Sequence, residues 1–140
     1  MNRAYVDANV ILRFLTGDPP EMAEPALELF AAADAGELAL IVDDIVVAEI
    51  VWVLGSFYKY PATEIGRTLQ ELLAHDAILV DDRSVLAEAL NLFVDHNVDF
   101  ADALVAARMR RRGMSDIYSF DTHFDRLPGI KRVAPGWAGQ

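Results

Sequence analysis

The 140-residue chain contains no cysteine, which excludes disulfides, zinc–thiolate sites and thiol nucleophiles. Its uncharged runs, such as residues 50–58, fall well short of the ~20 apolar residues that a membrane span requires. The first residues have no long apolar segment of the kind that marks a signal peptide. A glycine-rich phosphate loop is also missing. We therefore expect a soluble protein of the cytoplasm.

Basic residues are scarce, with 12 Lys and Arg against 22 Asp and Glu, a formal net charge of −10. This balance alone argues against a general nucleic-acid binder, which needs cations to neutralise phosphates. The charge is uneven, because residues 108–140 hold 7 basic and 3 acidic residues. Arg108, Arg110, Arg111 and Arg112 supply most of that excess. They are either ordinary cations at a helix end or a patch that contacts phosphate.

Apolar residues make up 54% of the chain, enough to bury the core of one domain over residues 1–140. Segments with strand character alternate with segments of helical period, which predicts an α/β fold with a mainly parallel sheet of four to five strands. The strands are expected at residues 4–6, 38–42, 77–80 and 116–120, with a fifth edge strand at 131–134. Residues 45–54 fit either a strand or a buried helix.

Two acids follow predicted strands. Asp7 comes after the first strand and Asp121 after the fourth. Because the carboxyl ends of parallel strands open onto the ligand crevice, both are candidate site residues. Each could instead cap the helical turn that follows it. Asn9, two residues after Asp7, is placed to orient a carboxylate.

Two further acids lie within apolar helical segments. Glu49 is the single charged residue among residues 45–54, and a carboxylate there is costly unless it is paired, protonated or bound to a cation. It therefore points into a pocket or lies on a narrow exposed stripe. Asp102 borders the apolar face of the next-to-last predicted helix, and Asp99 lies on the same side. Both could simply favour the helix N-terminus.

Carboxylates from two strand ends and two helices could converge on one crevice. Clustered carboxylates repel one another, and a hard divalent cation such as Mg²⁺ or Mn²⁺ relieves that repulsion while leaving room for phosphate. The three histidines are scattered along the chain and are better explained as surface or capping residues. No Ser-His-Asp arrangement is indicated.

In this order and spacing the four acids resemble the PIN-domain ribonucleases, and among these the VapC-type toxins of prokaryotic toxin–antitoxin pairs. The similarity extends from residue 5 to about residue 133, nearly the whole chain. Four motifs carry it: residues 5–18 around Asp7, residues 48–54 around Glu49, residues 102–107 beginning at Asp102, and Ser119-Phe120-Asp121 with Phe124-Asp125. Ala8 stands where the family often has threonine, so a hydroxyl contact is missing there.

The resemblance implies a three-layer α/β/α sandwich, a helix over residues 45–54 and metal-dependent endoribonuclease activity. Asp7, Glu49, Asp102 and Asp121 would hold one or two Mg²⁺ or Mn²⁺ ions. It further implies a homodimer, a small antitoxin that inhibits it, and structured RNA targets such as transfer or ribosomal RNA. The candidate helpers are Asp99 and Asp125 beside the metal, Asn9 and Ser119 for orienting ligands or contacting phosphate, and Arg13 with Arg108, Arg110, Arg111 and Arg112 as RNA contacts.

Other classes place an acid after the first strand as well. A haloacid-dehalogenase-like phosphatase needs Asp-x-Asp there, whereas this chain has Asp7-Ala8-Asn9. A receiver domain needs paired acids at the first strand, which are absent. A solitary RNA-processing nuclease and a PIN-like module without catalysis remain alternatives to a toxin.

Overall fold

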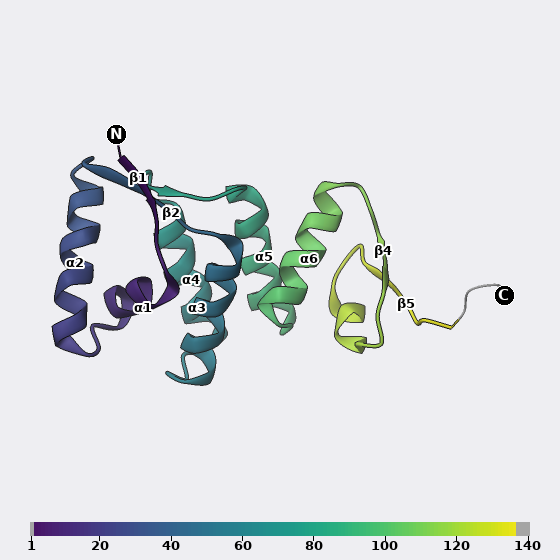
Figure 1. Cartoon of the computed structure of the whole chain (residues 1–140). Coiled ribbons are helices and arrows are strands. Elements are labelled where there is room, and N and C mark those ends of the chain that lie inside the picture. The colour runs from purple at the N-terminus through teal and green to yellow at the C-terminus, as the bar shows by residue number, and fades with distance from the viewer. Residues whose placement is uncertain (1, 137–140) are drawn as a thin grey trace.

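The computed structural model describes residues 2–136, so Met1 and residues 137–140 of the predicted domain lie outside the described part. Figure 1 shows strands and helices alternating along the chain, and no described helix is long and apolar enough to cross a membrane. The helices are α1 (Ala8–Thr16), α2 (Pro20–Asp34), α3 (Asp44–Ser56), α4 (Ala62–Leu73), α5 (Arg83–His96), α6 (Phe100–Arg111) and the 3-10 helix η1 (Thr122–Arg126). The strands are β1 (Asn2–Tyr5), β2 (Leu38–Ile41), β3 (Ile78–Leu79), β4 (Asp116–Tyr118) and β5 (Lys131–Val133).

The first sheet contains three parallel strands in the order β1-β2-β3. Tyr5 pairs with Ile41 at the carboxyl end of the β1–β2 ladder. The amide of Val6 extends that ladder by donating to the Ile41 carbonyl at 3.1 Å. Helices α1 and α2 connect β1 to β2, and α3 and α4 connect β2 to β3. These are βαβ crossovers, as parallel strands require.

The core lies between β2 and the helices around it. Ala39 and Leu40 of β2 are buried, as are Ile50 and Leu54 of α3 and Leu69 of α4. Every residue of β1 is exposed, in contrast to β2. The central strand is therefore β2, and β1 forms an edge of this sheet.

The last two strands form a second, separate sheet, in which β4 and β5 pair in parallel. In Figure 1 they lie beyond α6, at the opposite end of the molecule from β1 and α2. The α/β class and the parallel strands are confirmed, but the five strands are divided three and two rather than joined in one central sheet. Hydrogen bonds hold this end in place, from Arg110 Nη1 to the Pro128 carbonyl at 3.1 Å and from Arg126 Nη1 to the Asn97 carbonyl at 2.7 Å.

The ambiguous segment at residues 45–54 is helical and forms most of α3. Asp43 caps this helix, since its carboxylate accepts a hydrogen bond from the Ile45 amide at 3.1 Å. Helix α2 begins at Pro20, a residue suited to the first turn of a helix, and continues through Pro25. The starting points of α2 and α3 therefore follow from local sequence.

Candidate active site

Asp7 lies at the junction of β1 and α1 and is exposed. It is the N-cap of α1, and its Oδ1 accepts a hydrogen bond from the Ala8 amide at 2.7 Å. This contact fixes one carboxylate oxygen and leaves the other facing solvent. Asn9 is also exposed, on the first turn of α1. The capping role and a ligand role are compatible, because capping uses only one of the two oxygens.

Glu49 lies on the exposed face of α3 together with Ile45 and Trp52, since residues three, four and seven apart share a helix face. Ile45 is 74% exposed and Trp52 is 67% exposed. In a single copy of the chain Glu49 therefore lies on an exposed stripe of α3, the second of the two predicted alternatives. Its neighbours Ala48 and Trp52 line a pocket together with Asp99 at the start of α6, but Glu49 itself does not line that pocket.

Asp102 lies in the first turn of α6 and is half-buried. Its pKa is raised above the ordinary value of 3.8, first by burial, then by the negative charges of Asp121 and Asp99. His123 acts in the opposite direction. Asp99 is the N-cap of α6, but its side chain makes no capping hydrogen bond. Asp102 is therefore the acid whose surroundings most disfavour its negative charge.

Asp121 follows β4 and is the N-cap of η1. Its Oδ1 accepts from the His123 amide at 2.8 Å, and the His123 ring nitrogen Nδ1 lies 3.4 Å from the same oxygen. The Asp121 amide in turn donates to Ser119 Oγ at 2.9 Å. Asp125 makes an ion pair with Arg132, with Oδ1 3.1 Å from Nε. Ser119 thus orients the backbone at Asp121, while Asp125 is already neutralised.

The structure brings together one half of the predicted set. Asp99, Asp102 and Asp121 influence one another electrostatically, with His123 beside them. Between residues 2 and 136 no three His, Asp or Glu side chains are grouped so that they could hold a metal ion. The predicted convergence of four acids is not formed within this single copy.

The comparison with known families settles the relationship. Residues 4–130 match the family model described as PIN domain. The chain belongs to the PIN-domain family. It is also 27% identical over 130 residues to a VapC ribonuclease of Aquifex aeolicus (strain VF5), an alignment that covers 93% of this chain and 95% of the relative.

His123 is the residue of this PIN domain that sequence reasoning undervalued. It was expected to be a surface or capping residue, yet its ring lies beside Asp121 and its charge acts on Asp102. The signal for it was its position two residues after Asp121, where an aspartate that caps a turn draws the next residues back toward its carboxylate.

The arginines of the PIN domain's basic segment are mostly engaged within the chain. Arg108 pairs with Asp44 of α3, Arg110 Nε lies 3.7 Å from Glu88 Oε1, and Arg111 Nη1 lies 3.1 Å from Asp82 Oδ2. Arg112 is exposed and has no ion pair in the described part of the chain. Arg13, on α1, donates to the Asp18 carbonyl at 3.1 Å. Arg112 is thus the arginine of this segment with most freedom to meet a ligand.

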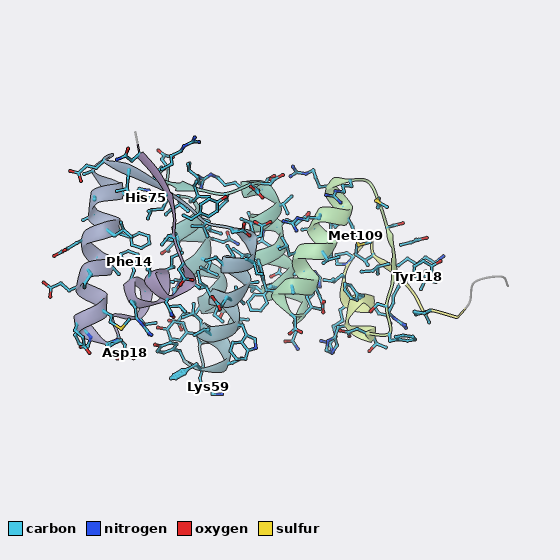
Figure 2. The ribbon with its side chains drawn as sticks, viewed as in Figure 1. Phe14, Asp18, Lys59, His75, Met109 and Tyr118 are labelled. Atoms are coloured by element: carbon cyan, nitrogen blue, oxygen red, sulfur yellow. The ribbon has the colours of Figure 1, made fainter. Side chains whose placement is uncertain are left out.

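An apolar groove lies on the other side of the PIN domain, away from the acids. Phe14, Phe30 and Leu72 contribute to it, and His75 stands at its rim. Phe14 and Phe30 stack with their ring centroids 4.0 Å apart, and Figure 2 labels Phe14 and His75 between the helices that form it. Its polar lining residues are Asp34, Thr68, Glu71 and His75, and because none of them is Arg or Lys this groove offers no permanent cation to a phosphate.

Proposed function

We propose that this PIN domain, over residues 1–140, is a metal-dependent endoribonuclease. The observation that carries the proposal is the family match across residues 4–130 together with the similarity to a VapC ribonuclease. The chain retains acids in all four motifs, at Asp7, Glu49, Asp102 and Asp121. We assign these four as the residues that bind metal and support catalysis.

The donor set fits a hard divalent cation. All four side chains offer carboxylate oxygens, the ligands that Mg²⁺ and Mn²⁺ prefer. The raised pKa of Asp102, due to burial and its acidic neighbours, is the condition that such a cation relieves. One or two ions, when bound, would polarise the phosphodiester and activate water.

Backbone amides and neighbouring side chains would hold the metal-binding acids in position. The Ala8 amide fixes one oxygen of Asp7, and the His123 amide fixes one oxygen of Asp121. Ser119 and Asp99 would act from outside the metal shell, the first through the Asp121 backbone. Asn9, exposed next to Asp7, would orient a ligand or contact phosphate. Asp125 is held by Arg132 and would act only indirectly.

We further propose that the nuclease is the toxin of a toxin–antitoxin pair, active in the cytoplasm on structured RNA such as transfer or ribosomal RNA. The similarity to a VapC ribonuclease supports this role. The antitoxin would be a small protein with a basic side chain for the acidic site. A short reading frame for a small DNA-binding protein immediately upstream is the expected genomic finding. Without such a neighbour, a solitary RNA-processing nuclease becomes the better assignment.

The nuclease proposal is tested by incubating the purified protein with structured RNA and Mg²⁺ or Mn²⁺. We expect cleavage that stops with EDTA and returns with added metal. Asp7→Asn and Asp102→Asn should each lower the cleavage rate at least about 100-fold, since metal stabilisation of several kcal/mol is lost and 1.36 kcal/mol is tenfold in rate.

Asp76→Asn provides the control, because Asp76 is an exposed acid just before β3 and outside the proposed set. That variant should cleave at the wild-type rate. Full activity in both Asp7→Asn and Asp102→Asn would contradict the assignment of these acids to the metal site. A wild-type protein that binds RNA but does not cleave it would instead be a PIN-like binding module. RNA cleavage that persists in EDTA would contradict the metal requirement.

A further inference from the structure

The outer edge of β1 carries no neighbouring strand. β1 pairs with β2 along Asn2–Tyr5, and no other described strand joins it. All four of its residues are exposed, and Tyr5 is 73% exposed. An edge of this kind presents unpaired amides and carbonyls that are ready to accept another strand.

The β4–β5 sheet contains only two strands and also has an open edge among the described residues. Two strands alone are only marginally stable in water, and β4 and β5 have no third strand among residues 2–136. Phe120, two residues after the end of β4, is 78% exposed. One more strand beside this pair would extend its ladder and cover apolar surface.

One copy of the chain does not join its own two edges in this arrangement. Helix α6 is fastened to α3 and α5 by the ion pairs of Arg108 and Arg111. The β4–β5 sheet is fastened behind α6 by the bonds of Arg110 and Arg126 to backbone carbonyls. Figure 1 accordingly places β4 and β1 at opposite ends of the molecule.

We propose that a second copy of the chain supplies the missing strand, so that β4 of each copy pairs in parallel with β1 of the other. The exchange is reciprocal and therefore closes as a symmetric dimer. Each composite sheet has the order β5-β4-β1-β2-β3, with its first two strands from one copy and its last three from the other.

This pairing would complete the acid set in trans. Asp7 follows β1 and Asp121 follows β4, and the carboxyl ends of parallel neighbours lie at one edge of a sheet. Each site then combines Asp7 and Glu49 of one copy with Asp102 and Asp121 of the other. This assignment rests on the proposed nuclease function, and it accounts for the lack of a group of three or more acids that could hold a metal among the described residues of a single copy.

The exposed face of α3 supports the same arrangement. Glu49 is flanked by Ile45 and Trp52, both largely exposed. Large apolar side chains around a candidate ligand are typical of a surface that another protein covers. Helix α6 of the same copy already lies against part of α3, and the β4–β5 end of the second copy would cover the remainder.

Activity of mixed dimers tests the proposal. Asp7→Asn and Asp121→Asn proteins are each expected to be inactive alone. When they are co-refolded in equal amounts, half of the dimers contain one of each, and one of the two sites in such a dimer is intact. The mixture should therefore recover about a quarter of wild-type activity. No recovery would mean that each site is built within one chain.

Asp7→Asn mixed with Glu49→Gln is the matched control. Both changes fall in the same half of the composite site, so every site in the mixed dimer remains damaged and no activity should return. Recovery in this control would contradict the proposed division of the acids. If the wild-type protein itself cleaves no RNA, the nuclease proposal fails, and strand exchange is then decided by cross-linking alone.

Cross-linking reports the pairing without any reference to activity. The chain has no cysteine, so single cysteines can be placed in β1 (Ala4→Cys) and in β4 (Asp116→Cys or Ile117→Cys). Mixing a β1 variant with a β4 variant should give a disulfide-linked dimer on a non-reducing gel, since neighbouring strands meet the geometric requirement. A variant with both Ala4→Cys and Ile117→Cys in one chain tests the alternative, and an internal disulfide within a monomer of it would overturn the proposal. The absence of a cross-link in every combination would overturn it as well.

Discussion

Asp102 is a single residue whose charged form is disfavoured by its surroundings in the folded domain. Its first-turn position on α6 favours a carboxylate through the helix dipole. Burial and the neighbouring charges of Asp121 and Asp99 outweigh that benefit, because the pKa of Asp102 is raised. Strained electrostatics of this kind are characteristic of functional sites.

We therefore expect Asp102→Asn to stabilise the metal-free protein at pH 7. A raised pKa means that the folded state binds a proton more tightly, so the contribution of Asp102 is favourable below its ordinary value of 3.8 and is lost as the pH rises through the raised pKa. Because Asp102 is only partly buried, solvent screens this penalty to a fraction of ~1 kcal/mol, and the expected Tm increase is about 1–2 °C. Thermal melts between pH 3 and 7 measure the difference, which should vanish at the acidic end.

Asp95→Asn, an exposed change on α5, is the control and should leave the Tm unchanged. An Asp102→Asn protein that melts below the wild type at pH 7 would show that the helix dipole dominates instead.

Sequence predicts the four acids as site residues because each lies where a strand ends or an apolar helical segment is interrupted. Their arrangement in space could not be predicted. Asp7 and Asp121 both cap the turns that follow them, so local pattern alone cannot separate capping from metal binding. The environment of Glu49 depends on what covers α3, and that is a matter of long-range packing rather than local sequence.

At the scale of elements, the crossing of α4 and α5 depends on a glycine. A Cβ at Gly66 would lie 2.5 Å from Val94 Cγ2, closer than the two carbons can approach. The absence of a side chain therefore lets the two helices meet at this point.

Gly66→Ala should lower the free energy of unfolding by about 1–2 kcal/mol, because overpacking outweighs the gain of up to about 1 kcal/mol in helix propensity. Adding Val94→Ala should remove the clash and recover part of the loss. Urea unfolding measures both. Gly55→Ala is the matched control, since its Cβ would meet only Ile65 Cδ1 at an ordinary 3.5 Å. That variant should be neutral or stabilised, and equal losses at both glycines would contradict the packing argument.

The sequence predicted the elements better than the sheets. The start of α2 follows from its leading prolines. Residues 45–54 of α3 fit a strand as well as a helix, and the helix there is implied by the family resemblance. Strand pairing joins residues far apart in sequence and carries no local signal. The division of five strands into two sheets therefore could not be anticipated from hydrophobic pattern.

At the scale of the whole molecule, the net charge of −10 opposes an RNA ligand, and most cations near the acids are already paired. Exchanging Arg112 for Gln should therefore weaken RNA binding more than the same change at Arg111, whose guanidinium is held by Asp82. Each lost phosphate contact lowers the slope of log K against log salt by about 1. Filter binding at several salt concentrations gives that slope.

Arg110→Gln should have an intermediate effect, because its ion pair with Glu88 is long at 3.7 Å. Metal affinity should change in none of these variants. Lys59→Gln is the control, since Lys59 lies beyond the end of α3, far from the basic segment in Figure 2. Equal RNA affinity in all variants would show that these arginines are ordinary cations at a helix end and do not contact RNA.

The exposed edge of β1 also has a consequence during synthesis. The β1–β2–β3 sheet is complete once residue 79 is available, whereas β4 begins only at Asp116. A growing chain therefore has an open strand edge while the segment between β3 and β4 is still being translated. Arg3, in the middle of that edge, places a positive charge where accidental pairing with other nascent chains would begin. The positive charge of Arg3, which disfavours accidental pairing, must also be accommodated when β4 of a second copy pairs with this edge.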